Sequence, residues 1–564
     1  MHAPPSTFSA LRSSILLTAI IALARILYLA FFCPYTLIED EAQYWVWAQN
    51  LDLSYYTKGP GVAWAIYAST NVFGNAEWAV RLPAVIASAI GAISLAGLSF
   101  DITKSRRITF LTAIAFHLVP SFLSLALLMT IDGPLVACWA FAAWCAWRGF
   151  AMQRLPWLLG LGLALGIGTL FKYTMLLALP GLVTWLFAWR HEAFSKRGTI
   201  PTLLIAMLLF GACLLPIIIW NQHNHWPTIA HQLGHLGIAG GDVKPTQGSG
   251  KGWHYNPLWT LTFLGTQIGL IGPILVLAIR HATESIQRRN VLDITTWKGE
   301  SLCLALSLPV LIFYFIISFI TEPEGNWPIA GSVTLIPLAA TRVAMALTSP
   351  DRKLWRRTRF LWSFAIILGF IIGFGMLRVD IFSHLPNLGK LVPVGRITGA
   401  RNMGEHASRI VIELRKETSQ EPFIITHHYG RASQLWYYTP DSHNNQPHTP
   451  VYCASSLMRE GRTTPWDFWP TMNLHSQPVN AQLLGRPALA VGLSREDWLQ
   501  HFERVEEIGA LDGDHKRDKQ GKPSRPAFRC YNFRGYQSGY PHAPRGENNQ
   551  PTPTSPSSTN GGTK

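Results

Sequence analysis

The chain has 564 residues, of which 49% are hydrophobic and only 14% are charged. Soluble globular proteins carry about 25% charged residues, so this composition, with a mean hydropathy of +0.18 and 22 tryptophans, excludes an ordinary soluble protein. The net charge of +15 follows from membrane topology and attraction to anionic lipid, and it gives no reason to invoke nucleic acid.

Apolar segments recur along the first two thirds of the chain. They cover approximately residues 15–32, 80–100, 108–128, 133–147, 157–171, 173–189, 200–220, 257–279, 301–320, 328–347 and 360–377. A spanning helix needs about 20 residues, so the segments at 133–147 and 157–171 are short. The block 157–189 fits either one long helix or two short helices that meet at Lys172.

The placement of Lys and Arg distinguishes these two readings, because short cytoplasmic loops collect positive charge. With two spans in the block and the N-terminus inside, every large basic cluster between the spans lies on the cytoplasmic side. The outer loops then hold only Lys58, Lys172, Lys244 and Lys251. A single merged span would move the last three basic clusters outside. We therefore predict about eleven spans, with the C-terminal region outside.

The C-terminal third has the composition of a small α/β domain. Residues 401–417 have helical spacing, and residues 423–426, 451–453, 488–491 and 528–533 read as strands. We predict a membrane domain at 1–378, an extracytoplasmic α/β domain at 379–540 and a disordered tail at 541–564. Cys453 and Cys530 lie in the outer domain, where a disulfide and two free thiols are both open alternatives.

Carboxylates cluster at the outer ends of two predicted spans. Asp40 and Glu41 follow the first span, and Asp132 lies between the third and the fourth. Carboxylates in such places can act as a general base or hold a divalent cation. The alternatives are a helix N-cap for Asp132 and a solvated helix start for the other two.

Several cations accompany these acids. Lys58 lies in the first outer loop, Arg81 opens the second span, Lys172 lies in the fifth-to-sixth turn, and Arg25 lies inside the first span. Charge within a membrane is costly and suggests a functional site, although long side chains also reach toward headgroups. Acids and cations together at the outer boundary fit a phosphorylated lipid substrate.

The local strings add a resemblance to a known family. Residues 38–47 (IEDEAQYWVW), 55–64 (YYTKGPGVAW), 129–134 (MTIDGP), 171–174 (FKYT) and 326–328 (NWP) resemble the dolichyl-phosphate-mannose protein mannosyltransferase-like family, glycosyltransferase family 39. Its relatives include bacterial aminoarabinose transferases that modify lipid A. The resemblance covers about residues 15–350. One departure is Gly59-Pro60-Gly61, where many relatives have two consecutive prolines.

The resemblance implies an all-α polytopic membrane fold of the GT-C type and a sugar donor carried on a polyprenyl phosphate. It also implies an inverting displacement at the anomeric carbon, with the lipid phosphate leaving. By position in the matching strings, Asp40 is the expected general base, Glu41 supports it and Asp132 is the second acidic site. Lys58, Arg81 and Lys172 are expected to bind the donor phosphate, and Tyr55, Tyr56 and Asn326 to bind substrate.

The expected acceptor is a lipid, a glycan or a protein at the outer face of the inner (plasma) membrane. No metal site is predicted from the residues, although a divalent metal stays open as a cofactor. The alternative function is a transporter or flippase of lipid-linked sugars. Transporters tend to place polar groups at mid-membrane in broken helices, often within inverted repeats. The acids here lie mainly in outer loops, which favours the enzyme.

Overall fold

We describe a computed structural model of the chain, which covers residues 7–235, 255–379, 397–440, 449–457, 463–514 and 523–536. The chain divides into two compact units. The first comprises Met1–Glu405, Ser433–His443 and Asp512–His515, and the second comprises His406–Ala432, Asn444–Leu511 and Lys516–Lys564. The first unit thus includes pieces of the predicted domain at 379–540. The predicted tail at 541–564 lies outside the described residues.

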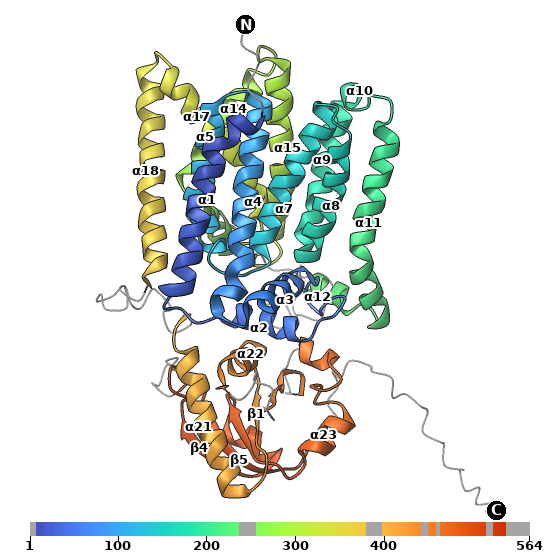
Figure 1. Cartoon of the computed structure of the whole chain (residues 1–564), viewed down its shortest axis with the longest axis vertical. Helices are drawn as coiled ribbons and strands as arrows, with labels where there is room; N and C mark the ends of the chain where they lie inside the picture. Colours follow the sequence, from blue (N-terminus) through green and yellow to red (C-terminus); the bar gives the residue numbers. More distant parts are fainter. Residues whose placement is uncertain are drawn as a thin grey trace, which may run out of the picture. The chain divides into compact units, whose positions relative to one another are not determined.

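The first unit is built from long apolar helices (Figure 1). Among the described residues, six helical segments are long and apolar enough to cross a membrane, or seven if one bent pair counts as a span. The six are α1 (Thr7–Phe31), α4 (Glu77–Thr103), α11 (Thr199–His223), α15 (Ile294–Ile317), α16 (Ala330–Val333) with α17 (Leu335–Thr348), and α18 (Arg352–Leu377). The chain is therefore a multi-pass membrane protein, while the count of about eleven spans stays a prediction.

The other predicted spans contain shorter helices, and the ends of these helices test the predicted break at Lys172. They are α5 (Arg106–Leu118), α6 (Pro120–Leu125), α7 (Asp132–Ala146), α8 (Pro156–Phe171) and α9 (Ala178–Ala188). The predicted break at Lys172 is confirmed, because its backbone is extended (φ −152°, ψ 130°) between α8 and the 3₁₀ turn η2 (Tyr173–Leu177). The prediction of two helices in this block is therefore correct.

The apolar segment predicted at 257–279 is bent in the structure. The structure has α13 (Pro257–Ile271) and α14 (Pro273–Gln287), which are bent by 99° relative to each other. Gly272 between them has φ +69°, a left-handed conformation that glycine adopts readily. The following Pro273 lacks a backbone N–H and disfavours a helical conformation in the residue before it. Hydropathy alone does not register this bend.

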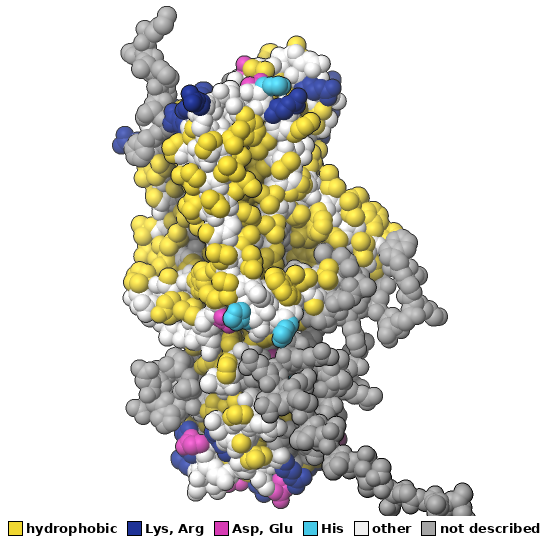
Figure 2. Space-filling view, turned by 90° about the vertical axis from the view of Figure 1, so that its right-hand side faces the viewer, with side chains coloured by type: hydrophobic (Ala, Val, Ile, Leu, Met, Phe, Trp, Pro, Cys, Tyr) yellow, Lys and Arg dark blue, Asp and Glu magenta, His cyan; other side chains and the backbone are white. Residues whose placement is uncertain are grey.

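Short helices lie at both ends of the first unit. The loop between α1 and α4, which the sequence predicts to be an outer loop, forms α2 (Glu39–Gln49) and α3 (Gly61–Phe73), and α12 (Pro227–His235) follows α11. The four-residue helix α10 (Arg190–Ala193) lies at the opposite end. Figure 2 shows hydrophobic side chains covering the helical part of the molecule and Lys and Arg side chains at the upper end of that part, with a second set at the bottom of the picture. This distribution agrees with the charge asymmetry expected of a membrane protein.

Small residues let the helices of this unit approach closely. A Cβ atom added to Gly162 in α8 would lie 2.1 Å from the carbonyl oxygen of Ala206 in α11, and one added to Gly166 would lie 2.5 Å from Cβ of Cys213. Membrane helices associate mainly through such close packing, since lipid offers no hydrophobic driving force between them. The glycines of α8 therefore determine how α11 packs on it.

The second unit contains a five-stranded sheet in the order β2-β1-β3-β5-β4. Its strands are β1 (Phe423–Thr426), β2 (Val451–Cys453), β3 (Ala488–Val491), β4 (Phe502–Gly509) and β5 (Ala527–Phe533). β1 pairs in parallel with β2 and β3, whereas β5 pairs antiparallel with β3 and β4. The four strands predicted at 423–426, 451–453, 488–491 and 528–533 are confirmed as β1, β2, β3 and β5. β4 was not predicted, because an edge strand with the sequence FERVEEIG is rich in charged residues that strands usually avoid.

Helices accompany this sheet along the chain. They are α21 (Ala400–Thr418), which begins in the first unit, α22 (Tyr429–Tyr438), which ends in the first unit, α23 (Gln477–Leu483) and α24 (Arg495–Leu499). The predicted helix at 401–417 matches α21 and is confirmed. The expected α/β character of the C-terminal region is confirmed as well.

The two cysteines of the C-terminal region are not joined. Cys453 lies in β2 and Cys530 in β5, and both are buried free thiols. β1 and β3 separate their strands, and three strand spacings amount to roughly 14 Å. A disulfide requires Cα atoms within about 7 Å. The alternative of a disulfide is therefore wrong, and burial raises the pKa of the Cys453 thiol to about 12.

The packing of α8 on α11 gives a test of the fold. Replacing Gly162 by leucine should force the two backbones apart, because the side chain would meet the carbonyl of Ala206, and should destabilise the unit by about 1–3 kcal/mol. Thermal unfolding of the purified protein in detergent measures this change. Gly211→Leu on α11 is the matched control, since no atom lies within 4 Å of its Cβ position. Equal melting temperatures for the two variants would contradict the packing argument.

Candidate active site

Glu41 and Arg81 form a buried ion pair that joins the start of α2 to α4. The Arg81 guanidinium donates through Nε to Oε1 of Glu41 at 2.9 Å and through Nη2 to Oε2 at 2.7 Å. Glu41 is fully buried, and 1% of Arg81 is exposed. Two parallel hydrogen bonds are the strong geometry between an arginine and a carboxylate. Each residue thus neutralises the other, and neither charge faces solvent.

The same pair holds backbone groups from other stretches of the chain. Arg81 donates to the carbonyl oxygens of Tyr35 at 3.1 Å and Thr36 at 2.9 Å. Glu41 accepts from the backbone N–H of Met129 at 2.8 Å. The pair therefore fixes the segment between α1 and α2 against both α4 and the loop that follows α6.

Asp40 lies one residue before Glu41 in the first turn of α2, and its side chain is exposed. The positive end of the helix dipole stabilises a carboxylate at this position. Within the described residues, no hydrogen bond or ion pair engages the Asp40 carboxylate. The buried pair beside it thus presents an unpaired acid at the surface of the unit.

Lys58 lies in the turn between α2 and α3. Its ammonium donates to the hydroxyl of Tyr44 at 2.8 Å and lies 5.1 Å from the centre of that ring. Two backbone hydrogen bonds between Tyr55 and Lys58, at 3.1 and 3.2 Å, close the turn. In the part of the chain that the structure describes, no carboxylate pairs with this half-buried lysine. Its charge is therefore free to meet an anion.

Asp132, Lys172 and Asn326 come together from three distant parts of the sequence. Lys172 Nζ donates to Oδ1 of Asp132 at 2.7 Å, and Asn326 Nδ2 donates to Oδ2 at 2.8 Å. Asp132 is 2% exposed, whereas the Lys172 side chain is 14% exposed. Both oxygens of the Asp132 carboxylate therefore have donors, and the accessible groups of this cluster are Asn326, which is exposed, and the half-buried Lys172.

The turn that carries Lys58 packs directly on the end of α8, next to Lys172. A Cβ atom on Gly59 would lie 2.3 Å from the carbonyl oxygen of Leu170, and one on Gly61 would lie 3.0 Å from its carbonyl carbon. A larger residue at position 59 would push the turn away. The departure from two consecutive prolines thus has a physical reason, and close packing brings the two lysine-bearing segments together.

The side chains of the two tyrosines predicted to bind substrate contact other residues of the protein. The Tyr55 hydroxyl donates to the carbonyl oxygens of Trp47 at 2.9 Å and Asn50 at 3.0 Å, and its ring stacks on Trp47 with centroids 4.3 Å apart. Tyr56 is buried against His231 of α12, with centroids 4.9 Å apart. These contacts indicate that both residues support the outer loop.

Residues to which the sequence analysis assigned no role also support this loop. Trp220 at the end of α11 donates Nε1 to Oδ2 of Asp52 at 2.7 Å, and Gln232 of α12 donates to the carbonyl of Thr57 at 3.2 Å. Burial raises the pKa of the Asp52 carboxyl above its usual value. These contacts tie α11 and α12 to the loop that carries Lys58. Nothing in the local sequence around Asp52 or around Trp220 indicates that these two distant segments pair.

No cluster of three or more His, Cys, Asp or Glu side chains suited to a metal ion occurs among the described residues. The carboxylate oxygens of Glu41 and Asp132 accept hydrogen bonds from the cationic side chains of Arg81 and Lys172. Both carboxylates are therefore paired with protein cations.

The chain is similar to known membrane glycosyltransferases in sequence. Residues 57–220 match the family described as dolichyl-phosphate-mannose-protein mannosyltransferase. A lipid A galacturonosyltransferase from Rhizobium johnstonii is 27% identical over 326 residues, which are 57% of this chain and 63% of that protein. An undecaprenyl phosphate-alpha-4-amino-4-deoxy-L-arabinose arabinosyl transferase from Enterobacter sp. is 28% identical over 174 residues, covering 29% of this chain and 31% of the relative.

Solved structures show a likeness in fold. ArnT from Cupriavidus metallidurans in the apo state aligns over 91% of this chain and 97% of its own, with a TM-score of 0.56 and 13% identity. The same protein bound to undecaprenyl phosphate aligns over the same shares, with a TM-score of 0.53 and 13% identity. The expected resemblance and the GT-C fold are thus confirmed. The chain spans less than two thirds of the length of the curated relatives it matches.

The buried pair leads to a stability prediction. Glu41→Gln leaves the Arg81 guanidinium buried without its counter-ion and should destabilise the protein by about 3–5 kcal/mol. Chemical or thermal unfolding in detergent measures the loss. Glu421→Gln removes one partner of the exposed pair Arg415–Glu421 and should cost about 0–1 kcal/mol. Similar losses in the two variants would mean that the Glu41–Arg81 pair does not hold the outer loop.

Proposed function

We propose that this protein is a glycosyltransferase that moves a sugar from a polyprenyl-phosphate donor to a lipid acceptor. The reaction takes place at the outer boundary of the membrane. The curated relatives are named for sugar transfer to lipid A or from undecaprenyl phosphate. The bias of Lys and Arg in the loops supports an extracytoplasmic position for α2, α3 and the C-terminal domain in the inner (plasma) membrane.

One observation carries the proposal. Of the charged residues expected at the site, Asp40 and Lys58 have no opposite charge beside them within the described residues, whereas Glu41 pairs with Arg81 and Asp132 pairs with Lys172. A sugar transfer from a phosphate needs a base for the acceptor and a cation for the leaving group. The two unpaired groups have these two chemistries.

Of the paired residues, Glu41, Arg81 and Asp132 then have supporting roles. Glu41 and Arg81 hold α2 so that Asp40 is exposed, and neither has a free polar group with which to bind substrate. Asp132 accepts from Lys172 and Asn326 through separate oxygens, so we assign it a positioning role in place of contact with the acceptor. Lys172 is the member of this cluster that reaches the donor phosphate together with Lys58.

The proposed step is an inverting displacement. Asp40 takes the proton of an acceptor hydroxyl as its oxygen attacks the anomeric carbon of the sugar. The bond from that carbon to the phosphate oxygen breaks, and the electron pair leaves with the lipid phosphate. Lys58 and Lys172 stabilise the negative charge that develops there, because charge-assisted hydrogen bonds are the strong ones. A phosphate held by cations leaves without a strong general acid.

A transfer assay tests this function. Purified protein is incubated with labelled undecaprenyl-phosphate sugars, among them the aminoarabinose and galacturonic acid derivatives, and with lipid A. Asp40→Asn should lower kcat by about 100-fold or more, because it removes the base that accepts the proton, while donor affinity stays within about twofold. Glu39→Gln, which changes a neighbouring carboxylate in the same helical turn, should retain most of the activity.

The outcomes of this assay separate the alternatives. Full transfer by Asp40→Asn would remove that residue from the mechanism. Movement of the labelled donor across liposomes without any transfer product would favour a transporter or flippase of lipid-linked sugars, the other reading of the sequence.

The phosphate site makes a separate prediction. Lys58→Met removes the cation and keeps most of the apolar stem, so the affinity for undecaprenyl phosphate should fall by roughly 10- to 100-fold, as expected for one hydrogen bond to a charged group. Equilibrium binding of the phosphate lipid in nanodiscs measures this change. Lys104→Met is the matched control, because the Lys104 side chain is 60% exposed at the far end of α4. An unchanged affinity would place the phosphate elsewhere.

A further inference from the structure

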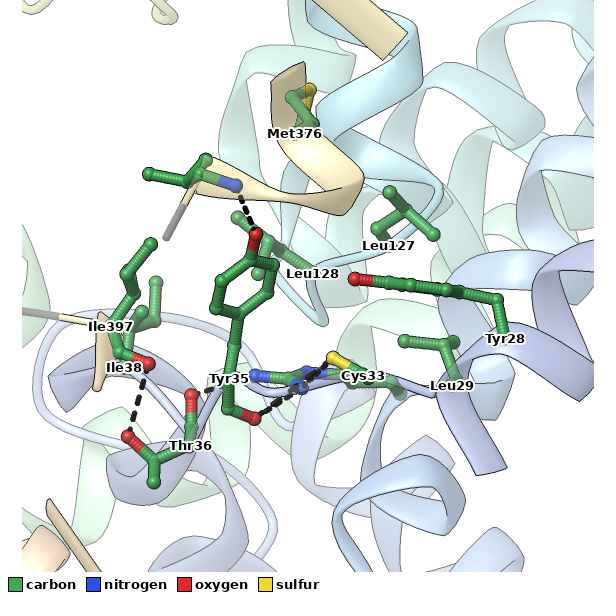
Figure 3. A pocket seen from close by; sticks show the side chains of 12 residues that line it. Tyr28, Leu29, Cys33, Tyr35, Thr36, Ile38, Leu127, Leu128, Met376 and Ile397 are labelled. Carbon is green, nitrogen blue, oxygen red and sulfur yellow. Dashed lines mark hydrogen bonds between the residues drawn. The ribbon is translucent and has the colours of Figure 1, made fainter. Parts of the chain in front are cut away.

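A small cavity lies beside the buried Glu41–Arg81 pair. Its volume is about 80 Å³, and its walls come from the outer ends of α1 and α18, the segment between α1 and α2, and the residues after α6. Figure 3 shows the lining side chains, among them Tyr28, Leu29, Leu127, Leu128 and Met376. The cavity is bounded mainly by hydrocarbon groups. Cavities of this kind stay dry, because water needs polar partners.

The polar groups at the wall of the cavity are already bound. The Tyr28 hydroxyl donates to the carbonyl oxygen of Leu377 at 2.7 Å. Arg81 directs its nitrogens to Glu41 and to the carbonyls of Tyr35 and Thr36. These groups have no requirement for an ionic or sugar ligand. The cavity suits an apolar ligand, because such a ligand would make the dispersion contacts that the lining side chains lack around an empty space.

The size and the surroundings indicate a hydrocarbon chain. A cavity of roughly 150 Å³ accepts a benzene molecule, so a volume of about 80 Å³ has room for the end of a chain and not for a ring system. The helix ends at the cavity carry exposed apolar side chains, with 73% of Phe32 and 62% of Phe374 exposed. In a membrane, such side chains lie against lipid. Hydrocarbon chains are therefore the molecules that surround this part of the protein.

The position of the cavity indicates whether the donor lipid or the acceptor lipid would place a chain in it. Ile38 contributes to the wall and lies two residues before Asp40, the proposed base for the acceptor. In contrast, none of the residues that line the cavity belongs to α3, α8, α11 or α12. Those helices carry or adjoin the two lysines proposed for the donor phosphate. A chain in the cavity would thus belong to the molecule whose hydroxyl lies at Asp40.

We propose that this cavity binds the end of an acyl chain of the lipid acceptor and thereby positions its hydroxyl beside Asp40. The proposal rests on the proposed function and deepens it, because it names an acylated lipid as the acceptor and a site for its chain. The cavity adjoins Arg81, so a bound chain would also fill the space behind the pair that holds α2. Acyl chains too short to reach the cavity would then be poorer acceptors.

Photolabelling tests the site without any need for activity. The full-length protein in nanodiscs is exposed to hexa-acylated lipid A that carries a diazirine at a chain end, and the labelled peptides are sequenced. The label should fall on the peptides with Leu127 or Met376 and be displaced by excess unlabelled lipid A. Displacement by undecaprenyl phosphate instead would assign the cavity to the donor. Equal displacement by phosphatidylethanolamine, or a label on other peptides only, would also overturn the proposal.

A matched pair of variants on α1 tests the effect on transfer. Leu29→Trp places a ring in the cavity, whereas Leu27→Trp changes a residue that is 45% exposed and does not line it. Leu29→Trp should raise the KM for lipid A by roughly three- to tenfold, since only packing contacts are lost. The KM for the donor and the transfer to fully deacylated lipid A should not change. Leu27→Trp should match the wild type.

The controls keep the two proposals apart. An equal KM shift for acylated and deacylated lipid A, or no shift at all, would overturn the chain site while leaving the glycosyltransferase function intact. If Leu29→Trp fails to fold, Leu127→Phe fills the same cavity from the loop after α6 and is measured in its place. If the wild type transfers no sugar, the proposed function fails, and the photolabelling result still decides whether an acyl chain occupies the cavity.

Discussion

The outer face of the membrane unit depends on the buried ion pair between Glu41 and Arg81. Two hydrogen bonds join the side chains, and both are removed from water. A buried charge without its partner is strongly destabilising, so each residue requires the other in place. Because the pair also binds backbone groups of Tyr35, Thr36 and Met129, one interaction fixes the start of α2, the end of the first span and the loop after α6 together.

The charged residues of the site fall into two groups, those with a buried partner and those without an opposite charge beside them. Glu41, Arg81 and Asp132 have buried partners and give the site its shape, whereas Asp40 and Lys58 remain without an opposite charge among the described residues. An unpaired charge is tolerated only where water or a ligand reaches it. The exposed first turn of α2 and the half-buried turn before α3 satisfy this condition, which is why we assign the base to Asp40 and the first phosphate contact to Lys58, with Lys172 beside it.

Much of this arrangement could be predicted from the sequence, but the pairing within it could not. Hydropathy located the long helices, and the break at Lys172 followed from the placement of basic loops. The bend at Gly272 escaped, because an apolar run has the same hydropathy whether it is straight or bent. The edge strand β4 escaped because it is rich in charged residues and its buried positions, Phe502 and Val505, lie three residues apart and do not alternate with exposed ones. Contacts such as Asp132 with Asn326 join residues far apart in the sequence, which no local pattern encodes.

The position of the site at the ends of the helices suits substrates that are themselves lipids. A polyprenyl chain or an acyl chain stays in the bilayer at little cost, since lipid and protein interiors are both apolar. Only the phosphate, the sugar and the acceptor hydroxyl have to leave the headgroup region and meet charged side chains. Lys58 and Asp40 belong to short outer elements between α1 and α4, so the protein needs to order the reacting groups and not the whole of either lipid. The Glu41–Arg81 pair provides that order, and a chain end held beside it would align the second substrate with the same elements.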